Sequence, residues 1–199
     1  MSRTFYTLAF LLGFQIAFAN GAAECFQKAW THPNDGGLGL TRGLAKRLCK
    51  GARYASDVIL CYAYAWEHPS RGGLGLTAGQ AVDLCIQASD AAEVISCYAK
   101  AWDHPSRGGL GLTAGQAVEI CGQATKAAEV IRCYEIAWEH PSRRGLGLTA
   151  GQAVDLCKQT RNATKTIRCY EHAWNHPDND GLGLTRGGAI NLCMESDRR

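Results

Sequence analysis

The sequence lacks the features that define several large classes of protein. Its 199 residues carry 21 basic and 18 acidic side chains, so there is no concentrated basic excess to bind a nucleic-acid backbone. After residue 19, no stretch approaches the roughly 18 uninterrupted apolar residues that a membrane helix needs. We therefore expect a soluble mature chain that binds no nucleic acid and has no membrane span.

Catalytic signatures are also missing. There is no G-x-S-x-G nucleophile motif, no H-E-x-x-H metal motif and no phosphate-binding glycine loop between a strand and a helix. The conspicuous residues instead recur at equivalent places, whereas catalysis normally needs one asymmetric group of nucleophile, base and orienting residue. The sequence therefore predicts neither an enzyme, nor a cofactor, nor a metal site.

The amino-terminal segment has the pattern of a secretory signal peptide over residues 1–19. Arg3 precedes an apolar stretch that ends in the A-x-A cleavage site Ala17-Phe18-Ala19. Loss of this segment leaves 20 basic and 18 acidic residues, a net charge of +2. Ten cysteines in an exported chain predict disulfides and an oxidising compartment. The compartment is extracellular or periplasmic, depending on the kingdom of the source.

A repeat of 36 residues organises the rest of the chain. The pentad Ala-Trp-x-His-Pro occurs five times, and residues 61–96 match residues 97–132 at 28 of 36 positions. The period predicts one repeat domain over residues 20–199. It divides without remainder into the units 20–55, 56–91, 92–127, 128–163 and 164–199.

Each unit has the pattern of two helices joined by a loop. Apolar residues in 91–102 follow the spacing of an amphipathic helix, which must end near His104 because Pro105 disfavours helical geometry in the residue before it. A glycine-rich loop follows. Thr113 and Gln116 then form a capping-box pattern at the start of a second apolar helix. The predicted fold is all-α, an α-solenoid of five 36-residue helix-loop-helix repeats stapled by disulfides.

This helix-pair array resembles tetratricopeptide and Sel1-like repeats, which have about the same period. The G-x-G-L loop followed by a helix is similar to the Sel1-like type, whose members include secreted cysteine-rich proteins. The resemblance implies a stack of helix pairs and assigns no role to any residue. The cysteine spacing and the Ala-Trp-x-His-Pro pentad depart from both families.

The cysteine spacing alternates between 24 and 12 residues. Connectivity is not determined by spacing alone. Bridges across the 12-residue gaps would leave Cys25 and Cys193 unpaired, whereas bridges within each hairpin use every cysteine and join equal depths of two antiparallel helices. We therefore predict the pairs Cys25–Cys49, Cys61–Cys85, Cys97–Cys121, Cys133–Cys157 and Cys169–Cys193.

The loops carry the strongest indication of an interaction surface. Arg71, Arg107 and the pair Arg143 and Arg144 recur with the period, so they should form a basic stripe along one edge of the array. Such a stripe would attract a protein or peptide partner, one of acidic character. The alternative is that these arginines are merely solvated, some of them paired with the acidic residue four positions earlier.

Histidines and aromatic residues recur as well. The five His-Pro histidines are expected to support helix carboxyl termini, although His172 and His176 could also face a single metal ion. The five tryptophans and the tyrosines after four of the cysteines lie on the apolar stripe, so we expect them in the core. Tryptophans exposed in a groove would instead offer a stacking platform.

These observations favour an exported scaffold that binds a protein or peptide. The alternatives are a small-ligand or glycan-binding protein that uses repeated Trp and His sites, and a structural extracellular or envelope component. Asn162 begins a glycosylation sequon, which has meaning only if the source is eukaryotic.

Overall fold

Five pairs of helices form the computed structural model, which describes residues 21–196. The predicted signal peptide lies outside the described residues. The fold class is confirmed: residues 21–196 hold ten α-helices and no strand. The pairs are α1 (Gly21–Trp30) with α2 (Arg42–Leu48), α3 (Ala55–Trp66) with α4 (Ala78–Cys85), α5 (Ala91–Trp102) with α6 (Ala114–Cys121), α7 (Ala127–Trp138) with α8 (Ala150–Cys157), and α9 (Ala163–Trp174) with α10 (Arg186–Ser196).

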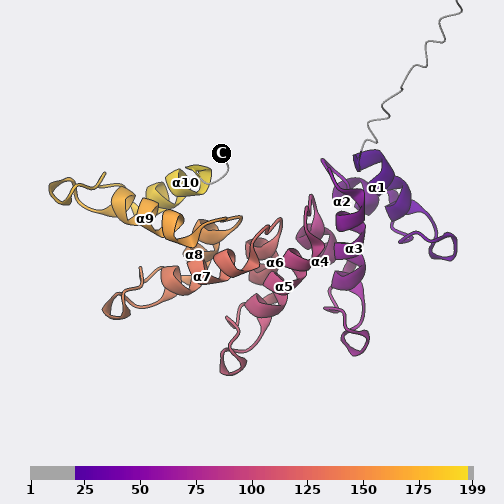
Figure 1. Ribbon diagram of the computed structural model, residues 1–199, viewed down its shortest axis with the longest axis horizontal. Helices are drawn as coiled ribbons and strands as arrows, with labels where there is room; N and C mark the ends of the chain where they lie inside the picture. The colour runs from indigo at the N-terminus through magenta and orange to yellow at the C-terminus, as the bar shows by residue number, and fades with distance from the viewer. Residues whose placement is uncertain (1–20, 197–199) are drawn as a thin grey trace, which may run out of the picture.

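The pairs stack in two layers that curve into a fan. The first helices of successive units pack on one another, and so do the second helices, so that α3 contacts α1 and α5 while α4 contacts α2 and α6. Figure 1 shows that the long loop within each pair points outward on the convex side, where neighbouring loops diverge. The short turns between units gather on the concave side.

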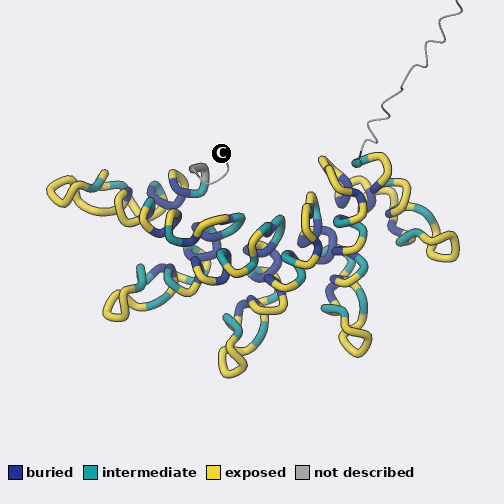
Figure 2. Tube along the Cα trace, viewed as in Figure 1, coloured by how far each residue is buried: buried dark blue, intermediate teal, exposed yellow. Residues whose placement is uncertain are grey.

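The core consists of the same positions repeated in every unit. On α3, Val58, Cys61, Tyr62 and Ala65 are buried at the spacing of one helix face. Tyr62 and its counterparts in the next three units are 1–3% exposed, which confirms the tyrosines as core residues, and burial raises the pKa of the Tyr62 hydroxyl. In Figure 2 the buried residues lie where the helices pack, and the loop tips are exposed.

The glycine-rich loop closes the carboxyl end of the first helix. The backbone amides of Leu74, Gly75 and Leu76 donate to the carbonyls of Tyr64, Glu67 and Ala65. These carbonyls have no partner within the helix, so the loop satisfies them. The same three bonds recur in all five units. The G-x-G-L motif is therefore accounted for by folding alone.

One glycine of this loop cannot be replaced. A Cβ on Gly73 would stand 2.1 Å from the Glu67 carbonyl oxygen, and the equivalent glycines of the other units are equally crowded. This close approach of two backbone segments is what the first glycine of the G-x-G-L motif permits.

A disulfide joins the two helices of each unit. The bridges are those predicted, and their Cα–Cα distances are 5.5–5.7 Å. Thr77, Thr113 and Thr149 each cap the second helix in a reciprocal box with the glutamine three residues on. In the end units the threonines cap without that return bond, and Leu44 and Gly188 stand in the place of the glutamine.

Carboxylates also link one unit to the next. Asp57 accepts from the backbone amide of Ala91 at 3.4 Å, Glu93 from that of Ala127, and Glu129 from that of Ala163 at 2.7 Å. Each bond places a negative charge at the amino terminus of the following unit's first helix, where the helix dipole favours it. The stacking of units is therefore held by polar contacts as well as by apolar packing.

Candidate interaction surfaces

The predicted basic stripe lies at the tips of the diverging loops. Arg71, Arg107, Arg143 and Arg144 are all exposed. Arg144 has a left-handed backbone (φ 67°) at the position that glycine occupies in the two preceding units. Because the loops spread apart on the convex side, these arginines form separate points along a rim and do not gather at one place (Figure 1).

Three of these arginines have an acidic neighbour on their own hairpin. Arg71 lies 3.5 Å from Glu67, Arg107 lies 2.7 Å from Asp103, and Arg143 lies 3.9 Å from Glu139. The hydrogen bond from Arg107 holds the pKa of the Asp103 carboxyl below its usual range. Such exposed pairs add little stability. They do reduce the net positive charge that the rim presents.

The tryptophans are exposed, so their expected place in the core is wrong. Trp30, Trp66, Trp102 and Trp138 are 56–58% exposed and Trp174 is 45% exposed. Each is the last residue of its helix, on the side toward the diverging loops, where adjacent hairpins spread apart (Figure 1). The neighbouring alanine is fully buried in every unit and occupies the core instead. The two end tryptophans stack on Phe26 and Tyr170 of their own helices.

The repeated histidines do not have the expected role at a helix carboxyl terminus. In each unit the imidazole Nδ1 accepts the backbone amide two residues on, as His68 does from Ser70 at 3.2 Å. The histidine therefore caps the short 3₁₀ turn that begins at the proline.

The alternative metal pair stays unassigned. Within residues 21–196, His172 and His176 belong to no group of three or more His, Cys, Asp or Glu side chains that could hold a metal ion. Asn162, the sequon residue, caps α9 by accepting the backbone amide of Lys165 at 2.9 Å.

A polar groove on the concave side was not found by sequence reasoning. It has a volume of about 410 Å³, and its lining comes from all four turns between units. These residues are Gly51, Arg53, Tyr54, Gln87, Ser89, Gln123, Thr125 and Arg161.

The glutamines of these turns have an unusual backbone. Gln87, Gln123 and Gln159 have φ of 59–66°, and the equivalent residue of the first unit is Gly51 at 73°. A left-handed conformation costs a non-glycine residue about 1 kcal/mol. The alignment of three glutamines with a glycine just after a helix, a position that usually prefers glycine, was the signal that could have identified this site.

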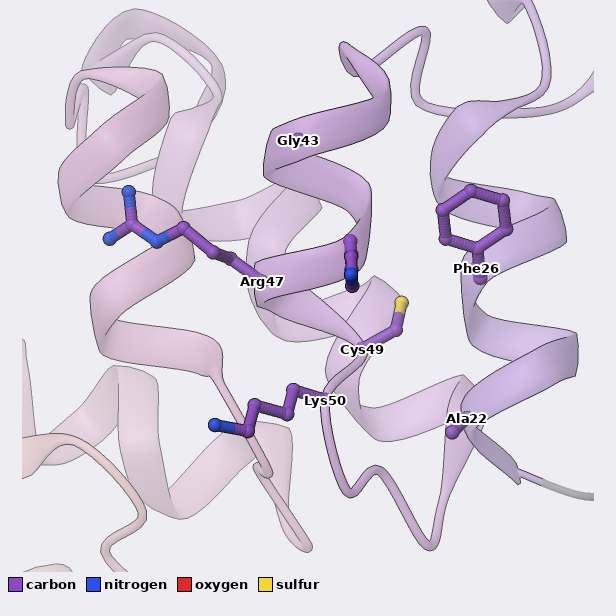
Figure 3. Close-up of a pocket in the computed structure, with 7 residues that line it drawn as sticks. Ala22, Phe26, Gly43, Arg47, Cys49 and Lys50 are labelled. Atoms are coloured by element: carbon purple, nitrogen blue, oxygen red, sulfur yellow. The ribbon is translucent and has the colours of Figure 1, made fainter.

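The two ends of the stack differ. The hollow in Figure 3 lies on the outer face of the first unit, beside Phe26, where an earlier unit would pack. Here Lys46 and Lys50 take the places that Val82 and Ile86 have in the second unit, so two charged side chains border a hollow whose lining is otherwise mostly apolar. At the other end Leu192 is 44% exposed, although its equivalents in the other units are buried.

Comparison of the chain with protein-family models, curated proteins and solved structures found no match. The class of protein is therefore defined by the structure itself, as a disulfide-stapled helical repeat solenoid. Five intrachain disulfides are typical of an oxidising compartment. None of the helices within residues 21–196 has both the length and the apolar character needed to cross a bilayer.

Proposed function

We propose that this protein is a secreted or periplasmic scaffold, not an enzyme, that binds a protein or peptide partner through its convex rim. The observation that carries the proposal is the row of five exposed tryptophans, one on each rigid hairpin. Exposed tryptophan contributes strongly to binding when a partner covers it, and the core does not require it here.

The rim arginines support the same conclusion. Folding does not require them, because the end units have other residues in the same places. Asp35 and Asn179 are equivalent to Arg71, and Asn34 and Asp178 are equivalent to Ser70. Tryptophan and arginine are the two residues most enriched at the energetic centres of protein interfaces. Because the points are separated, each contact is modest and the affinity comes from engaging several of them together.

The proposal is tested by reversing the rim charge. The variant Arg71→Glu/Arg107→Glu/Arg143→Glu is compared with a control of equal charge change, Lys46→Glu/Lys50→Glu/Arg132→Glu, which lies off the rim. A partner captured from the native extracellular or periplasmic fluid is identified by mass spectrometry and titrated against both variants. The rim variant should bind about tenfold more weakly, with an unchanged melting temperature. Full affinity in the rim variant, or loss of its fold, would refute the proposal.

A glycan ligand is the second candidate, and the exposure of the tryptophans favours it, because an exposed indole can stack on a sugar face. The variants Trp66→Ala, Trp102→Ala and Trp138→Ala separate the two. The glycan candidate predicts that soluble polysaccharides quench the intrinsic fluorescence of the wild-type protein. It also predicts that the tryptophan variants lose polysaccharide binding, whereas the charge-reversed rim variant keeps it. If all three results are obtained, a glycan replaces the protein partner as the proposed ligand.

A further inference from the structure

The concave groove brings together residues that lie far apart in the sequence. The Gln159 Nε2 donates to the Gln123 Oε1 at 3.3 Å, although the two residues are 36 positions apart. The Gln87 Nε2 lies 2.8 Å from the place where a Cβ would stand on Gly51. Gln87 and Gln159 therefore reach back over the turns before them. Gln87 and Gln123 line the groove, and Gln159 is bonded to the Gln123 amide beside it.

Neither the core nor the turns require these glutamine side chains. Gln87 is exposed, and Gln123 and Gln159 are only half-buried, so none of them fills the core. Gly51 shows that the turn forms equally well without a side chain. The central units nevertheless carry an amide on a backbone that disfavours it. A strained conformation repeated three times around one groove indicates that the side chains are retained for binding.

The middle of the groove suits a peptide main chain. A primary amide has two donors and one acceptor, so it can pair with both the N–H and the C=O of a peptide group. An extended peptide presents these groups at regular intervals along its edge. Ser89 and Thr125 line the same groove and add hydroxyl donors and acceptors. Tyr54 is the one aromatic side chain in the lining, which gives a sugar polymer little to stack on.

The ends of the groove are positively charged. Arg53 in the first turn and Arg161 in the fourth turn line the two ends. The equivalent residues in the two turns between them are Ser89 and Thr125. No carboxylate belongs to the lining. Guanidinium groups bind carboxylates with paired hydrogen bonds, so an occupant with acidic side chains is matched at both ends.

We propose that the concave groove binds an extended peptide segment with acidic side chains, its main chain bonded to the glutamine amides and its carboxylates to Arg53 and Arg161. This site is independent of the convex rim, because it uses other residues on the opposite side of the fan (Figure 1). The two surfaces can therefore be tested separately.

The test begins with a random peptide library displayed on phage and selected on the intact, disulfide-bonded protein. Enriched peptides are synthesised, labelled and titrated by fluorescence anisotropy. The diagnostic variant is Gln87→Gly/Gln123→Gly/Gln159→Gly, in which every turn takes the residue that Gly51 already shows to be compatible with the fold. The rim variant Arg71→Glu/Arg107→Glu/Arg143→Glu is the control, and circular dichroism verifies that both remain folded.

We expect enriched peptides to carry Asp or Glu and to bind the glycine variant about tenfold more weakly or worse, because each lost hydrogen bond changes affinity several-fold. Arg53→Gln should weaken binding and reduce its dependence on salt, and the rim variant should bind normally. The proposal is overturned if no peptide is enriched or if the glycine variant keeps full affinity. It is also overturned if polygalacturonate occupies the groove while the peptides do not. If the peptides lose affinity for the rim variant and bind the glycine variant as tightly as the wild-type protein, they bind the rim, and the groove proposal is refuted.

Discussion

Removal of the central disulfide tests how the stack is stabilised. In the double variant Cys97→Ala/Cys121→Ala the bridge is lost without creating a free thiol. The bridge closes a loop with a sequence separation of 24. Its loss raises the conformational entropy of the unfolded chain and so lowers the free energy of unfolding by roughly 3.5 kcal/mol at room temperature. Both cysteines are fully buried, so two small voids add to this loss. Net stabilities of domains are about 5–15 kcal/mol, so one bridge is a large fraction of the total.

Position in the stack should determine the form of the transition. Over residues 21–196 the helices of each unit pack on those of the adjacent units, so a weakened third unit separates the first two from the last two. Urea unfolding followed by circular dichroism should therefore become broad or biphasic. The matched variant Cys25→Ala/Cys49→Ala opens a loop of equal length in an end unit and should fray that end alone. This account would be refuted if the free energy of unfolding of the central variant fell by less than about 1 kcal/mol, or if the two variants gave identical urea unfolding curves.

Three further predictions concern local features. Gln123→Gly should leave the fold as stable as before or raise its free energy of unfolding by up to about 1 kcal/mol, as measured in urea, because the left-handed strain is relieved; a clear destabilisation would contradict that reasoning. Thr113→Ala should lower the free energy of unfolding by about 1 kcal/mol, and Thr41→Ala, whose cap lacks the return bond, by less. In an NMR pH series the pKa of Asp103 should lie below the ordinary value of an aspartate, and Arg107→Gln should raise it toward that ordinary value. A native pKa below that of the unfolded chain stabilises the fold at neutral pH and loses this effect as the pH falls through the native value, but Asp103 is too exposed for a marked change in stability.

The repeat and its disulfides could be predicted because they depend on information within one unit. The 36-residue period, the helix spacing and the capping threonines are local, and the bridges follow from the depth of each cysteine in an antiparallel pair. Thr113 and Cys97 therefore lie where the sequence placed them. The loop arginines are also exposed at the tips, although nothing in the fold tests whether they bind.

The tryptophans and the groove could not be predicted, because both depend on how the units are arranged. Trp102 follows Tyr98 by four residues, so the helical period places them on one stripe, yet Tyr98 is 2% exposed and Trp102 is 56% exposed. The difference arises because the fan opens toward the convex side, which no single unit encodes. Likewise Gln123 and Gln159, one period apart, meet only because their units stack on each other.

Curvature also determines which size of partner each surface suits. On the convex side the loops diverge, so a ligand that touches Arg71, Arg107 and Arg143 at once must be large enough to follow the outside of the fan (Figure 1). On the concave side all four turns contribute to a single groove of about 410 Å³, so a short extended segment can reach from Arg53 to Arg161. A folded protein would therefore suit the rim, and a flexible peptide the groove. One partner could occupy both surfaces only by supplying a tail that passes to the inside of the fan.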